Sequence, residues 1–484
     1  MKRLSPAMRP SPEPPARAHD GSRESPDSPA ATVAAQLRTA CLWVVLLSPA
    51  FFATVVWGRA IVAANDVLGA AYGTPRAEVA LAPWRMQAAV GWAGLSFALF
   101  TATLVIALVA PRPARRRPGS AVLAGALLMY AGPVLAGVWA GHGGAGDWRL
   151  WLAPLLLTAF QLAPRPRLET LVRTLRAGLR VFTYGSLLVL VVAPNWAVLA
   201  SPVVNFGLDL VMPGGRLAGL SNHPAALGTL SVLALLLEVQ GIARTRLWLV
   251  HSAAAGLTLL FAQSRTAWLA ALVSLLFVYR REDALRAGRV HPAVKRLVAA
   301  GLAGSAALFS PAVVDGFHQV TSSDEVATLH GRELPWRLAL EAFHENIWFG
   351  YGPGLFSDRS SPVGGAFDHA HNQVLHTLGT AGIAGAAGLL VFLLVVLWTA
   401  ARTAAVTHGL SWALTATTLV LCVPEAPLRG NGFTPYLVLT LTLFTVLSTA
   451  SAQRAGQQSS APAARVPRPA AARESTAAPA MRTP

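Results

Sequence analysis

Long apolar runs recur along most of the chain and are separated by short polar connections. Several runs reach the roughly 18–20 residues that a helix needs to cross a bilayer. We expect twelve spans, within a range of eleven to thirteen, because the fourth, seventh and eighth runs are short. The predicted spans are residues 39–58, 86–110, 119–140, 148–163, 181–200, 222–241, 246–262, 266–280, 296–314, 378–400, 410–427 and 432–451. This pattern predicts an all-α polytopic membrane protein.

Two polar ends flank the apolar part of the chain. Residues 1–38 and 452–484 are rich in Pro, Ser, Ala and Arg and have no apolar stripe, so we expect disordered tails. The first apolar run starts only near residue 39, and no cleavable signal peptide is predicted. Residues 39–314 would then hold spans one to nine, and residues 378–451 spans ten to twelve.

The connection at residues 315–377 is too long to be a simple link between two spans. Within it, the segment "GRELPWRLALEAFHENIWFG" places Trp336, Leu340, Phe343 and Ile347 at spacings of four, three and four. This spacing predicts a short amphipathic helix that lies on the bilayer or on the helix bundle. The following "FGYGPG" would end it.

The distribution of charge predicts which side of the membrane each connection faces. The segments "PRPARRRPG", "PRPRLETLVRTLRAGLR" and "YRREDALRAGRVHPAVKR" follow spans two, four and eight, on the same side as both tails. The positive-inside rule makes this side cytoplasmic. We therefore expect a multi-pass protein of the cytoplasmic (inner) membrane with both termini in the cytoplasm. Its long loop, residues 315–377, would be extracytoplasmic.

Composition supports a membrane protein and argues against other classes. The chain is 54% hydrophobic and 13% charged, whereas soluble domains have about 25% charged residues. Its net charge of +17 lies largely in the short connections, which favours membrane topology over nucleic-acid binding. Cys41 and Cys422 both lie in apolar runs, so neither a disulfide framework nor a thiolate metal site is implied.

Three arginines are predicted to face outward, where arginine is normally depleted. They are Arg216, before span six; Arg265, between spans seven and eight; and Arg332, at the head of the loop helix. A single one could simply reach the lipid headgroups. Three together favour anion binding, because a guanidinium keeps its charge and binds phosphate oxygens bidentately. A lipid-linked diphosphate would suit such a site.

The segment "DHAHNQ", residues 368–373, lies at the membrane end of the long loop, which holds six of the twelve histidines. His371 could be a hydrogen-bonded interfacial residue or a general base that deprotonates a hydroxyl. A metal site made by Asp368, His369, His371 and His376 is a further alternative, although the spacing matches no metal motif. His369, His376 and His223 are weaker candidates for a base and suit structural roles better.

Four motifs in this order resemble the O-antigen ligase and polymerase family over roughly residues 200–400. They are Arg216 with "NHPAALG", then "SRTA", then "GR…PW…AL…F…N…FGYGPG", and finally "HNQVLHTLGTAGIAG". Members of this family are bacterial membrane proteins that act on undecaprenyl-diphosphate-linked glycans, with a fold similar to that of C-type glycosyltransferases. One departure is the turn His223-Pro224-Ala225, where the family often has Asn-Pro-Asn.

The resemblance implies a role for each matching residue. His371 would be the general base, Arg216 and Arg265 would hold the donor diphosphate, and Arg332 would help to position donor or acceptor. The reaction would invert the anomeric centre in a single displacement, without a metal ion or other cofactor. The other contacts expected with acceptor or sugar are those of His369, Asn372, Trp336 and Tyr351.

The partners implied are an undecaprenyl-diphosphate-linked glycan donor, a lipid-core or other glycan acceptor, and membrane lipids, without nucleic acid. A single histidine-rich loop favours a ligase, because polymerases more often carry two large arginine-rich outer loops. A polymerase and a transferase with a protein acceptor stay open. A polysaccharide transporter or flippase is the alternative from another class, but the titratable residues gather in one outer loop, which fits surface chemistry better.

Overall fold

Helices build nearly all of the part of the chain that the computed structural model describes. That part comprises residues 29–57, 82–109, 118–139, 147–199, 215–221, 223–278, 333–358, 360–363, 367–430 and 432–460. In chain order the first elements are α1 (Pro29–Phe51), the π-helix η1 (Phe52–Trp57), α3 (Pro83–Val109), α4 (Ser120–Trp139), α5 (Trp148–Leu162), α6 (Leu168–Val192), α7 (Pro194–Ala197), β1 (Val198–Leu199) and β2 (Arg216–Leu217). They are followed by α8 (Pro224–Val239), α9 (Trp248–Ala262), α10 (Arg265–Val278), α14 (Glu333–Glu345), the 3-10 helix η5 (Pro353–Phe356), α15 (Gln373–Thr403), α16 (Leu410–Cys422) and α17 (Pro435–Ser460).

The helices confirm an all-α membrane protein. Six of them are long and apolar enough to cross a bilayer, and five shorter apolar helices accompany these within the described residues. Together they coincide with eleven of the predicted spans, while the ninth, residues 296–314, lies outside the described part. The total of twelve and the extracytoplasmic position of the long loop stay predictions.

Three helices extend by about nine residues or more beyond their predicted spans. α1 begins at Pro29, ten residues before the predicted start of the first span, and α17 continues to Ser460, beyond the predicted end at residue 451. α6 begins at Leu168, so most of a segment predicted as a basic connection is helical. Its first turns bury leucines and a valine at helical spacing, and strong helix formers fill the rest. Hydropathy locates the apolar part of a helix and misses such amphipathic extensions.

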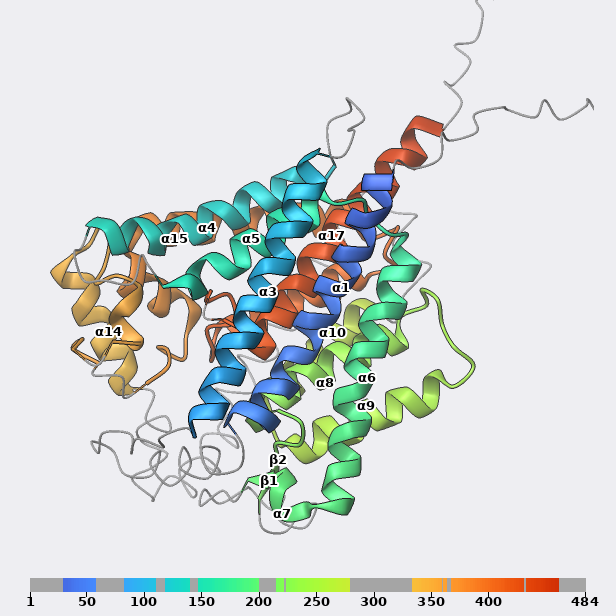
Figure 1. The fold of residues 1–484 in the computed structure, drawn as a ribbon, viewed down its shortest axis with the longest axis horizontal. Coiled ribbons are helices and arrows are strands. Elements are labelled where there is room, and N and C mark those ends of the chain that lie inside the picture. Colours follow the sequence, from blue (N-terminus) through green and yellow to red (C-terminus); the bar gives the residue numbers. More distant parts are fainter. Residues whose placement is uncertain are drawn as a thin grey trace, which may run out of the picture.

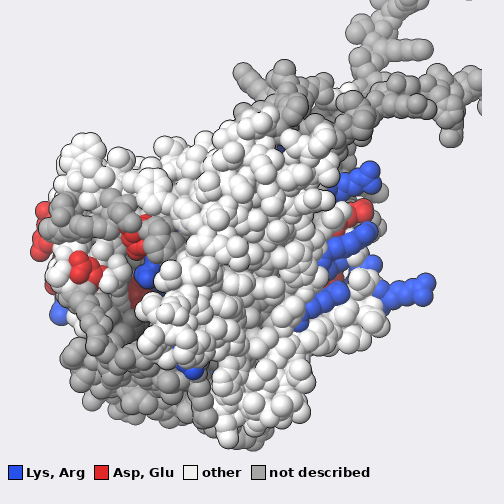
Figure 2. Space-filling view, viewed as in Figure 1, with Lys and Arg blue, Asp and Glu red and all other residues white. Residues whose placement is uncertain are grey.

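Helix α17 forms the centre of the bundle (Figure 1). Of its most apolar 18-residue stretch, 89% is buried by the surrounding helices, the largest share among the six long helices. The outer faces of α3, α4, α6, α9 and α15 instead expose large apolar side chains, as lipid-facing helices do. Figure 2 shows an uncharged surface between two charged edges, one over α14 and one over α6 and the α8–α9 connection. A bilayer would fit against this band.

Helix α15 packs closely along α4 because both present glycines at their contact. A Cβ atom added at Gly132 would lie 2.5 Å from the Cα atom of Gly385. Small residues of this kind let membrane helices approach each other and gain van der Waals contact. The helix that carries the "HNQ" motif at its start is therefore held firmly against the N-terminal half of the chain.

The segment after α14 is fastened into a break in α15. The break lies at Gly382, with φ 59° and ψ −155°. Across it, the backbone N–H groups of Ile383 and Ala384 donate to the carbonyls of Ile347 and Trp348, at 2.9 and 3.1 Å. A broken membrane helix needs such substitutes for its lost internal hydrogen bonds. The loop that follows α14 is thus anchored to the membrane helix.

The amphipathic helix predicted in the long loop is confirmed as α14, but its buried face differs from the predicted stripe. Small residues face inward, with Pro335, Ala339 and Ala342 buried, whereas Leu340 is 37% exposed. Close packing is the reason, because a Cβ atom at Gly379 of α15 would lie only 3.0 Å from the carbonyl oxygen of Ala339. The large residues of the predicted stripe therefore stay at least partly exposed to solvent or lipid.

Candidate functional site

Two histidines and one glutamate meet just before α15. His369 Nε2 lies 3.3 Å from Glu425 Oε2, and His371 Nδ1 lies 3.8 Å from the same oxygen. The side chains of His369 and Glu425 are almost buried, whereas that of His371 is 33% exposed. Of these three residues, His371 therefore has the side chain that a substrate can reach most easily.

The backbone at His371 is unusual and fixes the direction of its ring. His371 has φ 49°, in the left-handed region that few non-glycine residues occupy. Its backbone N–H donates to Nδ1 of His369 at 2.9 Å. Strained backbone of this kind persists where surrounding contacts impose it, and it often accompanies a functional site.

The hydrogen bonds at His369 indicate that this cluster holds protons rather than a metal ion. The three potential ligand atoms lie within 4.8 Å of one another. However, Nδ1 of His369 accepts a hydrogen bond, so in the neutral ring Nε2 carries the proton and directs it at Glu425. A metal-binding nitrogen must present a lone pair, and its ring usually donates through the other nitrogen. In His369 the nitrogen away from the cluster accepts a hydrogen bond, and the nitrogen that faces the cluster carries the proton.

The position of the Glu425 carboxylate also indicates which ring nitrogen of His371 can accept a proton. Its Nδ1 is the nitrogen near Glu425, and it has almost no accessible surface. This geometry suits a proton on Nδ1 that faces the carboxylate. Nε2 is then the ring nitrogen whose lone pair can receive a proton from a substrate.

The start of α15 is tied to the connection between α16 and α17. Asn372 caps α15 by accepting from Leu375 N at 3.0 Å, and its Nδ2 donates to Val423 O at 2.9 Å. Gln373 Oε1 accepts from Leu428 N at 2.8 Å. Arg429 Nη1 donates to the carbonyl of Asp368 at 2.7 Å. These bonds hold Glu425 and the histidines in one rigid unit.

The two predicted diphosphate-binding arginines both lie beside the turn between α9 and α10. Arg216 lies on β2, which pairs with β1 in the antiparallel register Leu199↔Arg216. Its Nε donates to the carbonyl of Ala262, the last residue of α9, at 3.3 Å. Arg265 is the first residue of α10 and is exposed. The sequence places these arginines 49 positions apart, and the fold brings both to this turn.

His223 connects the arginines with the histidine cluster. Its Nδ1 accepts from Ala225 N at 3.1 Å and so caps α8. The residue is exposed to solvent on one side, although many protein atoms lie around its ring. Burial and the Arg216 guanidinium lower the pKa of His223 to about 4, against the opposing effect of Asp368. Arg216 and Asp368 are thus both near enough to His223 for their charges to act on its ring.

The other predicted site residues have separate positions. Arg332 lies outside the described residues. Trp336 is half-buried on α14, and Tyr351 packs against the small apolar cluster around Leu355 and Ala370. His376 is buried and stacks on Phe356, with ring centroids 5.0 Å apart, which fits its predicted structural role. His369, by contrast, belongs to the cluster with Glu425.

Sequence reasoning missed Glu425 and Arg429. Both lie in "VPEAPLRGNGF", between the last two helices, and they contact residues more than fifty positions earlier. The predicted eleventh span, residues 410–427, included Glu425, whereas α16 ends at Cys422, so the acid lies in the connection together with Arg429. This placement in the sequence does not identify the partners.

A small recess of about 40 Å³ opens beside this unit, between α4, α5 and α15. Gln373, His376 and Arg429 line its polar side, and Met129 and Leu150 are among its apolar residues. The recess and the arginine pair are formed by different helices, with the connection that carries Glu425 on the recess side. The arginines and the small recess are thus two separate features of this part of the protein.

The fold and this site define a helical membrane protein with an arginine- and histidine-containing polar site at the ends of its helices. Residues 250–390 match a family model described as O-antigen ligase, which confirms the resemblance inferred from the motifs. The matched segment contains Arg265, α14 and His371, whereas Arg216 and Glu425 lie outside it. No curated protein matches the chain significantly. The match supports activity of the O-antigen ligase or polymerase type and lipid-linked glycan substrates.

Proposed function

We infer that the protein is a membrane glycosyltransferase of the O-antigen ligase type. It transfers a glycan from undecaprenyl diphosphate to a hydroxyl of an acceptor sugar at the outer face of the cytoplasmic membrane. The observation that carries this proposal is the pairing of His371 with Glu425 before α15, together with His223, on which the charges of both Arg216 and Asp368 act. A base and a diphosphate-binding group are the two elements that such a transfer needs.

The reaction begins with removal of a proton from the acceptor. His371 Nε2 takes the proton of the acceptor hydroxyl while its oxygen attacks the anomeric carbon of the donor. The bond between this carbon and the diphosphate oxygen breaks, and its electron pair leaves with undecaprenyl diphosphate. A single displacement inverts the anomeric centre. Glu425 stabilises the imidazolium that forms, as the carboxylate of a catalytic triad does.

The arginines act on the leaving group. Arg216 and Arg265 face the diphosphate, whose negative charge increases as the glycosidic bond breaks. A fixed hydrogen-bond donor aimed at developing charge lowers the activation barrier by about 3–4 kcal/mol. Arg332 assists in positioning donor or acceptor. None of these steps requires a metal ion, in keeping with the proton-holding geometry of His369.

The acceptor occupies the side of the recess. Its glycan approaches across Arg429, and a sugar hydroxyl reaches the exposed edge of His371. The aromatic rings of Trp336 and Tyr351 offer stacking surfaces for sugars farther along the loop. His369 and Asn372 act mainly by holding the ring of His371 and the start of α15.

The length of the glycan left on the carrier in a deletion strain tests this function. Loss of a ligase leaves long finished chains on undecaprenyl diphosphate, since only the last transfer is missing. Single repeat units would instead assign a polymerase of the same family. An unchanged carrier pool would refute both and favour transport. Complementation with the intact gene is the control for each result.

A further inference from the structure

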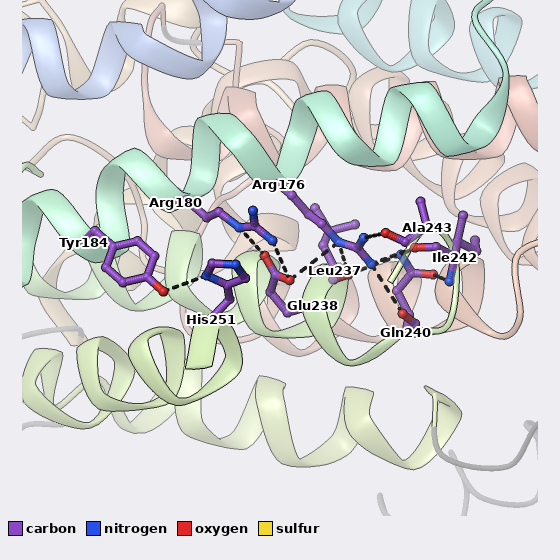
Figure 3. Close-up of polar contacts among 9 residues, drawn as sticks. All are labelled: Arg176, Arg180, Tyr184, Leu237, Glu238, Gln240, Ile242, Ala243 and His251. Carbon is purple, nitrogen blue, oxygen red and sulfur yellow. Dashed lines mark hydrogen bonds and ion pairs between the residues drawn. The ribbon is translucent and has the colours of Figure 1, made fainter. Parts of the chain in front are cut away.

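A second polar cluster lies where α6 passes the ends of α8 and α9 (Figure 3). Arg180 forms a bidentate ion pair with Glu238, with its Nε and Nη2 at 2.7 and 3.0 Å from the carboxylate oxygens. The Tyr184 hydroxyl lies 2.6 Å from Nδ1 of His251. These contacts join three helices through charged and aromatic side chains.

Arg176 has a structural role in this cluster. It is buried and donates to the carbonyls of Leu237, Gln240, Ile242 and Ala243. These carbonyls lie at and just after the C-terminal end of α8, where helical carbonyls have no internal partner. The guanidinium therefore closes the end of α8 and is not available to a ligand.

The cluster lies at the opposite end of the bundle from the candidate site. Glu238 is in the last turn of α8, and His223 is the N-cap at the other end of this helix. His251 is in the first turn of α9, whose last residue, Ala262, contacts Arg216. In the orientation that the proposed function requires, this end faces the cytoplasm.

Positive charge exceeds negative charge around these helix ends. Arg173, Arg176 and Arg180 lie on one face of α6, and Arg173, Arg180 and Arg244 all act electrostatically on Arg176. Glu238 is already fully engaged by Arg180. Glu169 and Arg173 form an ion pair at 3.6 Å, but their side chains are 65% and 66% exposed. Such an exposed pair is weak, so Glu169 offsets little of the positive charge of Arg173. Figure 2 shows the resulting basic edge.

Apolar surface adjoins this basic edge. The Arg244 guanidinium lies 3.3 Å from the centre of the Trp248 ring. Leu249 and Val250, which follow in α9, are 63% and 55% exposed, and Val181 of α6 is 40% exposed. Tryptophan and arginine at the end of an apolar helix are typical of the membrane–water interface. A ligand with an anionic head and an apolar tail matches this surface.

We propose that this basic edge is a binding site for an anionic phospholipid of the cytoplasmic leaflet. Arg173 and Arg244 bind the phosphate of the headgroup, and the acyl chains lie along the exposed apolar faces of α6 and α9. The site is separate from the diphosphate site, and it rests on the proposed function only for the orientation of the protein. A bound lipid would brace α6 against the α8–α9 connection.

Lipid binding by the purified full-length protein tests the proposal. Native mass spectrometry gives the Kd for phosphatidylglycerol and for zwitterionic phosphatidylcholine. We expect tighter binding of phosphatidylglycerol and about fivefold weaker binding in Arg244→Gln, since an arginine near an anionic lipid surface contributes about 1 kcal/mol. Arg173→Gln, at an exposed position, gives a second loss of similar size.

Arg402→Gln is the matched control. Arg402 lies 4.6 Å from the ring of Trp398, at the end of α15, and repeats the arginine–tryptophan contact away from the basic edge. We expect it to change the Kd for phosphatidylglycerol by less than twofold. Equal affinity for the two lipids, or an equal loss in Arg402→Gln and Arg244→Gln, would overturn the proposal. Because the readout is binding, failure of glycan transfer would leave its result unaffected.

Discussion

Substitution of Glu425 by glutamine tests the proposed mechanism most directly. The amide keeps the size of the side chain and can still accept a hydrogen bond from His369, but its negative charge is lost. Unit charges 3.8 Å apart, the separation of His371 Nδ1 and Glu425 Oε2, interact by about 4 kcal/mol at an effective dielectric constant of about 20. This energy corresponds to a rate loss of about 10³-fold.

Solvent reduces this value, since the side chain of His371 is 33% exposed. We therefore expect kcat to fall by about 10²–10³-fold in Glu425→Gln, because the charge acts mainly on the imidazolium of the transition state. The KM for the lipid-linked donor should change little, since Glu425 is not among the groups that face the diphosphate. The assay is transfer of a labelled glycan from undecaprenyl diphosphate in reconstituted vesicles.

Two controls separate a catalytic effect from a loss of structure. The melting temperature and elution volume of Glu425→Gln should match those of the unchanged protein. Glu425→Asp should recover part of the activity, since it restores the charge at a longer distance. A correctly folded Glu425→Gln protein with full kcat would refute the role of the carboxylate. A rise in donor KM alone would reassign Glu425 to donor binding.

Three further predictions follow from the site and its support. Arg265→Ala should lower transfer at limiting donor by about 10²–10³-fold, with partial recovery in Arg265→Lys, and full activity of a correctly inserted Arg265→Ala protein would contradict diphosphate binding. His223→Asn should keep full transfer activity and an unchanged dependence of activity on pH. Asn also caps helices, and the pKa of about 4 leaves His223 neutral above about pH 5. A shifted dependence of activity on pH would give His223 a role in proton transfer. Thermal unfolding should show Gly382→Ala destabilised by at least 1–2 kcal/mol, since its φ is positive and a Cβ atom would meet the backbone at 2.4 Å. Gly91→Ala, a helical position with open space, is the matched control and should be neutral or stabilising by up to about 1 kcal/mol.

The stability of the protein should also depend on pH through His223. Its pKa is lowered in the folded protein, so the unfolded chain binds more protons between the ordinary histidine pKa of about 6.5 and a pH of about 4. Stability contributed by the neutral ring is present above this interval and decreases as the pH falls through it. In His223→Asn this part of the pH dependence should be absent, as measured by melting temperature against pH.

The contacts around His371 explain how its left-handed backbone conformation is maintained while its ring stays in a fixed position. Asn372 ends the loop and begins α15, and the connection after α16 is bonded to the same residues. The close packing of Gly132 against Gly385 holds α15 in turn against α4. The left-handed backbone at His371 is therefore maintained by two membrane helices and their connections rather than by the loop alone.

The sequence by itself determined the membrane class, the approximate location of eleven helices and the presence of α14. It did so because burial in a bilayer requires apolar runs of fixed length, which are local properties of the chain. The motifs around Arg265 and His371 also gave the family resemblance that the match at residues 250–390 confirms. The amphipathic starts of α1 and α6 were missed, because their burial depends on neighbouring helices.

Only the tertiary structure decided which residues form the candidate site. Glu425 becomes a partner of His369 and His371 because the connection after α16 folds back over the start of α15. Arg216 lies beside the turn that precedes Arg265 because the two-residue strand β2 pairs with β1 and contacts the end of α9. The buried face of α14 is set in the same way, by the glycine of α15 against which it packs. Contacts between residues fifty positions apart leave no periodic signal in the sequence, since they depend on how whole helices pack.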